Sequence, residues 1–195
     1  MVGARLVRGG LAGAFGLLLL LATSGLAASF RISNLVVTNS NRALLVNAVL
    51  LGSLPASVVE GLATGIPASV RFQVELWQYN NWWVDRRVAT KIVERHVAYD
   101  LLTKEYRMSA VEGEVREPYV ARDIWEVERV LSELRRIPLA PITLLKRDDL
   151  YYVRVRAEVR SGTPDSSVSK VMPFLSSKAE TEWEQSPLLT VSRTR

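Results

Sequence analysis

Two adjacent tryptophans, Trp82 and Trp83, are the residues whose type and spacing most clearly suggest contact with another molecule. They follow Asn80-Asn81, a pair that favours a turn, and they precede Asp85. Aromatic side chains at such a turn can stack on sugar rings, enter a membrane interface or anchor a protein partner. The structural alternative places one ring over the core and the other along the hairpin. We expect one tryptophan to be exposed and the other to behave as core, because adjacent strand residues point to opposite faces.

Arginines on the polar phases of predicted strands form a second candidate contact surface. The set comprises Arg71, Arg107, Arg154 and Arg156, with Glu75, Glu105 and Glu158 nearby. Such a patch could bind an anionic ligand, although cross-strand ion pairs on a solvated sheet are the commoner arrangement. The candidate contact residues are therefore Trp82, Trp83, Asp85, Arg71, Arg107 and Arg154.

The residues available for catalysis or metal binding are few. His96 is the sole histidine and there is no cysteine, so a metal site would need carboxylate ligands that do not suit zinc or copper. No Gly-x-Ser-x-Gly motif, phosphate loop or dinucleotide fingerprint is present. Sequence cannot place the carboxylate pair of a glycosidase. We therefore expect no catalytic residue, no metal and no cofactor, and a carboxylate-based hydrolase is the last of the alternatives.

The first 27 residues have the organisation of a secretory signal peptide. Arg5 and Arg8 precede an apolar stretch over 9–22, and Gly25 and Ala27 supply the small residues of a cleavage site. Because the stretch 9–28 is 20 residues long, an uncleaved membrane anchor is the alternative. Residues 28–195 then form a single exported domain, periplasmic or otherwise extracytoplasmic, and we expect no other transmembrane segment.

Composition supports one globular domain. Hydrophobic residues make up 48% of the 195 residues and charged residues 23%. The net charge of +5 falls to +3 once Arg5 and Arg8 are removed, and the basic residues alternate with acids, so we expect no nucleic-acid partner. Without cysteine, disulfides are excluded and an apolar core must stabilise the fold.

Alternation of apolar and polar residues predicts most of the strands. It is clearest over 68–76 and over Leu150–Arg160, where every second residue is apolar. Further strands are expected over 30–38, 42–51, 86–99, 105–110 and 188–191. The strand over 42–51 is apolar on both phases and should be covered on both faces. In 86–99 the apolar phase changes between Ile92 and Val93, which predicts a β-bulge.

Two helices are predicted. Ser53–Ala63 begins at Ser53 as N-cap and ends before Gly65, which suits a left-handed residue. Asp123–Ile137 begins with a capping box, carries an apolar stripe, and ends at Arg135-Arg136 and Pro138. With mostly short turns between the strands, the fold class is mainly β: an antiparallel β-sandwich, immunoglobulin-like in character, with two peripheral helices.

Three short motifs resemble a known family. They are Gly65-Ile66-Pro67 before a strand, Trp-Trp-x-Asp over 82–85, and Tyr-x-x-Leu-Thr-x-x-Tyr over 99–106. Over residues 30–191 the chain resembles a bacterial family of exported proteins defined only as a domain of unknown function. Members are often encoded beside NtrY-like sensor histidine kinases, and the family has no established catalytic residues.

The resemblance and the residues together predict a non-enzymatic envelope protein that binds a partner. The resemblance implies that the partner is the sensing part of a membrane kinase. The alternative is a glycan- or peptidoglycan-binding module that uses Trp82 and Trp83.

Overall fold

The computed structural model describes residues 30–162 and 178–191, so the expected signal peptide and the segment after Gly162 lie outside the described residues. The strands are β1 (Arg31–Asn39), β2 (Ala43–Leu51), β3 (Ala68–Gln78), β4 (Arg86–Asp100), β5 (Glu105–Glu112), β6 (Tyr119–Ala121), β7 (Glu133–Pro141), β8 (Tyr151–Ser161), β9 (Lys178–Glu180) and β10 (Glu184–Gln185). The helices are α1 (Ala56–Ala63) and α2 (Ile124–Ser132), and a 3-10 turn, η1, covers Ile142–Leu144.

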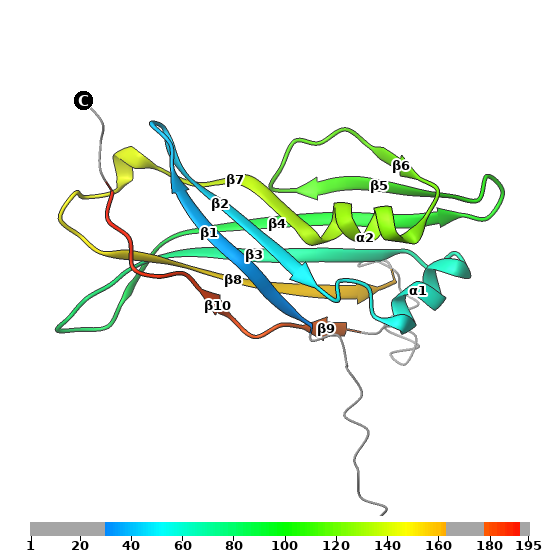
Figure 1. The fold of residues 1–195 in the computed structure, drawn as a ribbon, viewed down its shortest axis with the longest axis horizontal. Coiled ribbons are helices and arrows are strands. Elements are labelled where there is room, and N and C mark those ends of the chain that lie inside the picture. The colour runs from blue at the N-terminus through cyan, green and yellow to red at the C-terminus, as the bar shows by residue number, and fades with distance from the viewer. Residues whose placement is uncertain (1–29, 163–177, 192–195) are drawn as a thin grey trace, which may run out of the picture.

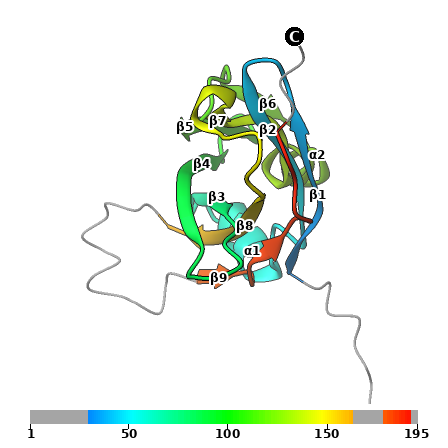
Figure 2. The same ribbon diagram turned by 90° about the vertical axis from the view of Figure 1, so that its left-hand side faces the viewer.

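The strands form two antiparallel sheets that share one apolar core. One sheet has the order β1-β2-β7, and the other has the order β10-β8-β3-β4-β5-β6, with β9 also paired to β8. Seen end-on, β1 and β2 form one layer and β3, β4 and β8 the other (Figure 2). Residues from both sheets contribute to one buried cluster. The expected mainly β sandwich with two helices is therefore confirmed.

The two clearest predicted strands, β3 and β8, lie side by side at the centre of the larger sheet. Each buries every second side chain against the core, as the alternation predicts. The inward residues are Ala68, Val70, Phe72, Val74 and Leu76 of β3, and Tyr151, Val153, Val155, Ala157 and Val159 of β8. The outer face is less solvated than the alternation suggests, because Ser69, Glu75 and Tyr152 are buried there.

In the smaller sheet, β1 and β2 form the expected hairpin. The Ser40 hydroxyl donates to the Ala43 carbonyl oxygen at 2.8 Å in the turn. One face of β2 is buried, but Leu45 and Asn47 on its other face are only half-buried. The prediction that β2 is covered on both faces was therefore wrong, because the smaller sheet has core on one side only.

The predicted bulge in β4 exists at a different residue. Pairing of β4 with β3 is regular from Val97 back to Ala89, and the register shifts at Val88, which has no partner on β3. Val93 pairs with Phe72 on the core side, whereas Ile92 pairs with Gln73 on the outer side. The apparent phase change arises because apolar residues lie on both faces of β4. Next to it, the pairing of β4 with β5 does shift between Glu94 and Arg95, with the extra residue on β5.

The second helix is shorter than predicted, and its expected C-terminal half is strand β7. Asp123 does cap α2, accepting a hydrogen bond from the Glu126 N–H at 2.9 Å. The helix ends at Ser132, and Leu134 and Ile137 continue the buried stripe as strand residues paired with β2. Pro138 does not stop a helix. It lies in β7, which pairs only with β2 among the described strands, and proline is tolerated on such an edge strand.

The first helix also begins later than predicted. Pro55 occupies the N-cap of α1, whereas the predicted cap, Ser53, is buried and its hydroxyl lies 3.4 Å from a Glu128 carboxylate oxygen. The predicted C-terminal glycine is confirmed, since Gly65 adopts φ +86°. At the end of the described chain, residues 188–191 form only an isolated bridge from Leu189 to Tyr151, and β6, β9 and β10 were not expected.

Strand β4 spans the long axis of the molecule and carries a turn at each end. The β3–β4 hairpin projects at one end, and the β4–β5 turn lies at the other end beside α1 (Figure 1). The two tyrosines of the 99–106 motif pair across the strands at the second turn, where the Tyr99 and Tyr106 ring centroids are 4.7 Å apart. The candidate tryptophans, Trp82 and Trp83, lie in the turn of the β3–β4 hairpin.

Candidate functional site

The turn between β3 and β4, residues 79–85, presents the most exposed aromatic surface of the described chain; we call it the tryptophan tip. Trp82 is 92% exposed, Trp83 is 79% exposed and Val84 is 75% exposed. Both rings are therefore in solvent, and the expectation that one of them behaves as core was wrong. The alternation of a strand does not apply to them, because β3 ends at Gln78 and the tip is an irregular turn.

The tip is exposed but its backbone is held by specific hydrogen bonds. The Asn80 N–H donates to Asp85 Oδ1 at 2.9 Å, and the Trp82 N–H donates to Asn80 Oδ1 at 3.0 Å. The Tyr79 N–H donates to the Leu150 carbonyl oxygen at 2.9 Å, which ties the tip to the segment before β8. Fixing the backbone in advance lowers the entropy lost when a partner binds.

Asp85, predicted as a contact residue, joins the tip to the sheet. Its Oδ2 accepts a hydrogen bond from the hydroxyl of buried Tyr152 at 2.7 Å. Burial, followed by this hydrogen bond to Asp85, raises the pKa of Tyr152 to about 12. The phenol therefore stays protonated and keeps donating across the neutral pH range, so Asp85 serves as an anchor of the turn.

The predicted arginines lie apart from one another on the outer face of the larger sheet, and each has a carboxylate within reach. Arg71 Nη1 is 3.1 Å from Glu94 Oε2, Arg107 Nη2 is 3.2 Å from Asp100 Oδ2, and Arg154 Nη2 is 3.9 Å from Glu75 Oε2. The arrangement is that of a cross-strand charged ladder.

Glu75 forms the centre of this ladder near the tip. The residue is 2% exposed, and its carboxylate accepts hydrogen bonds from Trp77 Nε1 at 2.8 Å, Gln73 Nε2 at 2.9 Å and Arg87 Nη1 at 3.2 Å. Arg154 stacks over the Trp77 ring, with its Cζ 5.1 Å from the ring centroid. The buried carboxylate is thus fully satisfied by donors, which is the condition for keeping a charge in a buried position.

Trp183, between β9 and β10, packs against the arginines of the charged ladder at the edge of the sheet. The guanidinium carbon of Arg154 lies 4.6 Å from its ring centroid and that of Arg156 lies 4.8 Å from it. Arg154 is therefore held between two indole rings, Trp77 and Trp183, by cation–π contacts. The rings of Trp77 and Trp183 thus have partners within the molecule, whereas Trp82 and Trp83 are exposed.

A buried arginine, Arg95, was not predicted as a site residue. Its guanidinium pairs with both carboxylate oxygens of Glu114 and lies 5.9 Å from the Phe72 ring centroid. Its Nη1 also donates to the carbonyl oxygens of Val130 and Glu133, each at 2.8 Å. These carbonyls lie at the junction of α2 and β7, and Arg95 thus supplies from β4 donors that the end of a helix lacks within itself. The sequence did contain a signal for this residue, because Arg95 alternates with Val93 and Val97 on the face of β4 that points into the core.

Arg95 and Glu114 also fix the segment between β5 and β6 against β4. At Gly113 in this segment φ is +83°, and a Cβ there would lie 1.7 Å from the Ile92 carbonyl oxygen. Only glycine permits this close approach. His96, on the outer face beside Arg95, pairs with Glu94, whose Oε1 lies 3.1 Å from its Nε2.

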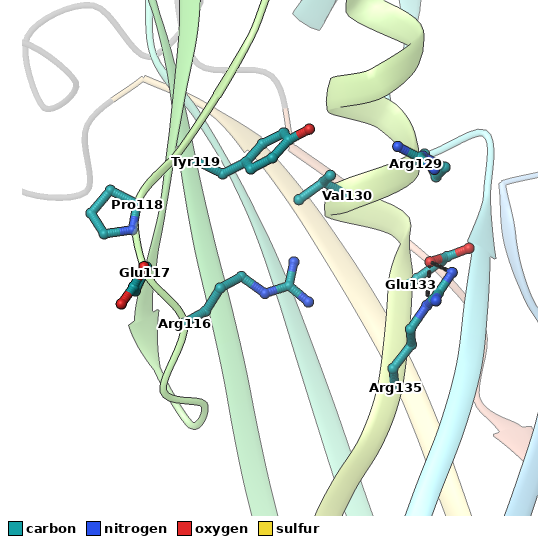
Figure 3. Close-up of a pocket in the computed structure, with 8 residues that line it drawn as sticks. All are labelled: Arg116, Glu117, Pro118, Tyr119, Arg129, Val130, Glu133 and Arg135. Carbon is teal, nitrogen blue, oxygen red and sulfur yellow. Dashed lines mark hydrogen bonds and ion pairs between the residues drawn. The ribbon is translucent and has the colours of Figure 1, made fainter.

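A cavity of about 450 Å³ lies between this segment, α2 and the start of β7. Residues 116–119 line one side, and the other side is lined by Arg129, Val130, Glu133 and Arg135 (Figure 3). None of these residues was predicted from the sequence to belong to a site. The lining residues come from the β5–β6 connection, α2 and β7, which are brought together only by the fold. In addition, the sequence predicted β7 as part of a helix.

The chain matches the family described as domain of unknown function (DUF4390) over residues 27–185. The chain belongs to this family. No curated protein and no solved structure matches the chain.

The family suspected from the short motifs, a domain of unknown function, is thus confirmed, while its association with sensor kinases stays a prediction. The DUF4390 match runs from before β1 to the end of β10, so the tryptophan tip, the charged ladder and the Arg95–Glu114 pair all lie within it. Within the described part of this DUF4390 domain, neither helix has the length and apolar character needed to cross a membrane.

Proposed function

We propose that this chain is an exported, non-enzymatic binding module of the cell envelope, and that the tryptophan tip contacts a protein partner. The observation that carries the proposal is the joint exposure of Trp82 at 92% and Trp83 at 79% on a backbone held by Asp85. Large aromatic anchors on pre-ordered backbones commonly supply most of the affinity of an interface. The signal-peptide pattern over residues 1–27 supports export.

The composition of the tip favours a protein surface as its target. Its apolar centre, Trp82 to Val84, is flanked by exposed Asn80-Asn81 on one side and by Arg86 and Arg87 on the other. An apolar centre inside a polar rim is the usual anatomy of a protein–protein interface. The family resemblance makes the sensing part of a membrane kinase the first partner to test.

Two side chains of types that enzymes use for catalysis, Glu75 and His96, are engaged in contacts within the molecule, which supports binding rather than catalysis. The buried carboxylate of Glu75 accepts from Trp77, Gln73 and Arg87, so it is held as a structural anion. His96, the sole histidine, pairs with Glu94 on the solvated sheet face. Both groups are used to join strands.

The proposal is tested by capture from envelope extract followed by affinity measurement with the purified partner. Trp82→Ala and Trp83→Ala should each weaken binding by roughly thirtyfold, since an interface anchor contributes about 2 kcal/mol or more. The matched control is Trp125→Ala on α2, where the side chain is 77% exposed but lies outside the tip. Its affinity should equal that of the parent chain.

Two outcomes would contradict a protein partner. If the tip variants bind the purified partner as tightly as the control, the tip is not the contact surface. If instead the tryptophans govern binding to insoluble peptidoglycan or to lipid vesicles, and no protein is retained, the ligand is a glycan or a membrane. All variants should be compared at equal folded fraction, checked by thermal melting.

A further inference from the structure

The cavity beside α2 has a rigid wall on the side of the β5–β6 connection. The connection is fixed by the ion pair of buried Arg95 with Glu114 and by the close approach of Gly113 to β4. Arg116 follows two residues after Glu114, and its guanidinium projects into the gap between the connection and α2 (Figure 3). The cavity thus presents a guanidinium from a backbone that contacts within the chain hold against β4.

Two guanidiniums at this cavity retain donor capacity. The nearest carboxylate oxygen to Arg116 is on Glu114, at 3.7 Å, and Glu114 is already paired with Arg95. Arg129 lies 3.7 Å from Glu126, whose same oxygen accepts from the Tyr119 hydroxyl. Both distances exceed those of a hydrogen bond.

The other charges at the cavity are neutralised or directed elsewhere. Arg135 donates from Nε to Glu133 Oε2 at 2.6 Å, so this pair is internally balanced. The Glu117 side chain points away from the gap (Figure 3). Arg116 and Arg129 are therefore the guanidiniums lining this cavity that have a carboxylate nearby but none at hydrogen-bond distance.

An apolar surface lies next to these guanidiniums. The Tyr119 ring and the Val130 side chain face each other across the gap, and Pro118 adjoins them on the connection (Figure 3). A few polar groups that fix orientation beside an apolar wall are the general features of a small-molecule site. The volume of about 450 Å³ lies in the range of such sites.

We propose that this cavity binds a small organic carboxylate. The carboxylate accepts hydrogen bonds from Arg116 and Arg129, and the apolar part of the ligand lies between Tyr119 and Val130. A planar guanidinium matches a carboxylate in geometry as well as in charge. This site is separate from the tryptophan tip, and the proposal stands whether or not the tip binds a protein.

The test is a nuclear magnetic resonance titration of the full chain with benzoate as the probe. Benzoate should shift the backbone amide signals of residues 116–119 and 129–133, whereas benzamide, which has the same shape without the charge, should bind at least about tenfold more weakly. Inorganic phosphate carries the charge without the apolar part and should also bind more weakly than benzoate. Stronger binding of phosphate or equal binding of benzamide would overturn the proposal.

Variants locate the binding to the two arginines. Arg116→Gln and Arg129→Gln should each weaken benzoate binding by about tenfold or more, because each removes a charged donor. The matched control is Arg122→Gln, whose side chain is 87% exposed and pairs with Glu105 outside the cavity. Equal loss in the control, or no loss in either cavity variant, would refute the assignment. Thermal melting identifies any variant that fails to fold, and the other cavity variant then carries the test.

Discussion

The two turns at the ends of β4 are built alike but differ in their links to the rest of the fold. Each is organised by one aspartate: Asp85 accepts from the Asn80 N–H at the tryptophan tip, and Asp100 accepts from the Leu102 and Thr103 N–H groups at the β4–β5 turn. Those backbone hydrogen bonds, followed by the nearby charge of Arg107, hold the pKa of Asp100 below its usual value. Asp100 acts within its own hairpin, whereas Asp85 also reaches Tyr152 on β8.

The side chains on the two turns differ in what lies beneath them. Leu101 packs beside α1, where a Cβ at Gly65 would be 3.3 Å from its Cδ1. At the tryptophan tip no such support is present among the described residues, and both indole rings are in solvent although their backbone is anchored to a third strand. A turn that is firmly anchored but uncovered is better suited to contact another molecule than to complete the core.

The largest expected effect separates the two aspartates. Asp85→Ala should lower the free energy of unfolding by about 1–3 kcal/mol, because the buried Tyr152 hydroxyl loses its acceptor. Asp100→Ala should lower the free energy of unfolding by less, because the backbone N–H groups that donate to Asp100 are exposed and can bind water instead. Urea denaturation measures both. The double variant Asp85→Ala with Tyr152→Phe should recover part of the loss, and equal losses for the two aspartates would remove the distinction between the turns.

An intermediate effect is expected from the glycine beneath the β4–β5 turn. Gly65→Ala should destabilise the fold by roughly 1–2 kcal/mol, because an L-residue is disfavoured at φ +86°. Gly162→Ala is the matched control, since Gly162 has φ +99° but a Cβ added there would meet nothing within 4 Å. Any excess loss at Gly65 in urea denaturation reports the contact with Leu101. A loss no greater than that of the control would show that the contact contributes nothing.

The smallest effect is expected at the tryptophans themselves. Trp82→Ala and Trp83→Ala should each change the free energy of unfolding by less than about 0.5 kcal/mol, because neither ring packs on the core. Leu102→Ala, at a side chain that is 94% exposed on the opposite turn, should behave in the same way. Early thermal melting of either tryptophan variant would mean that the tip has a structural role.

Sequence patterns predicted the parts of the fold whose side chains repeat with the period of a regular ladder. Strands β3 and β8 alternate without interruption, and so their inward residues were identified correctly. The failure at α2 and β7 has a physical cause: Leu131, Leu134 and Ile137 have helical spacing, but β7 has register shifts against β2 that give a strand the same spacing. At the change from helix to strand, the Val130 and Glu133 carbonyl oxygens accept hydrogen bonds from Arg95, which is distant in the sequence.

The candidate site was predicted in part. The tryptophan tip was located from residue type and turn signals, but the exposure of both rings depends on a turn geometry that alternation does not describe. Residues of the cavity beside α2 belong to segments that only the tertiary structure brings together. Arg95 is a single charged residue among the inward-facing apolar residues of β4, and it lies where β4, the β5–β6 connection and the end of α2 meet.

The burial of Arg95 has a consequence for the order of folding. Burying a guanidinium without its partners costs free energy because the charge loses its hydration. We therefore expect Arg95 to be buried only when Glu114 and the C-terminal end of α2 are in position to bind it. Strand β4 therefore cannot complete its packing before the connection to β6 and the helix are in place. We expect these three segments to unfold as one cooperative unit and to share a single level of protection against amide hydrogen exchange.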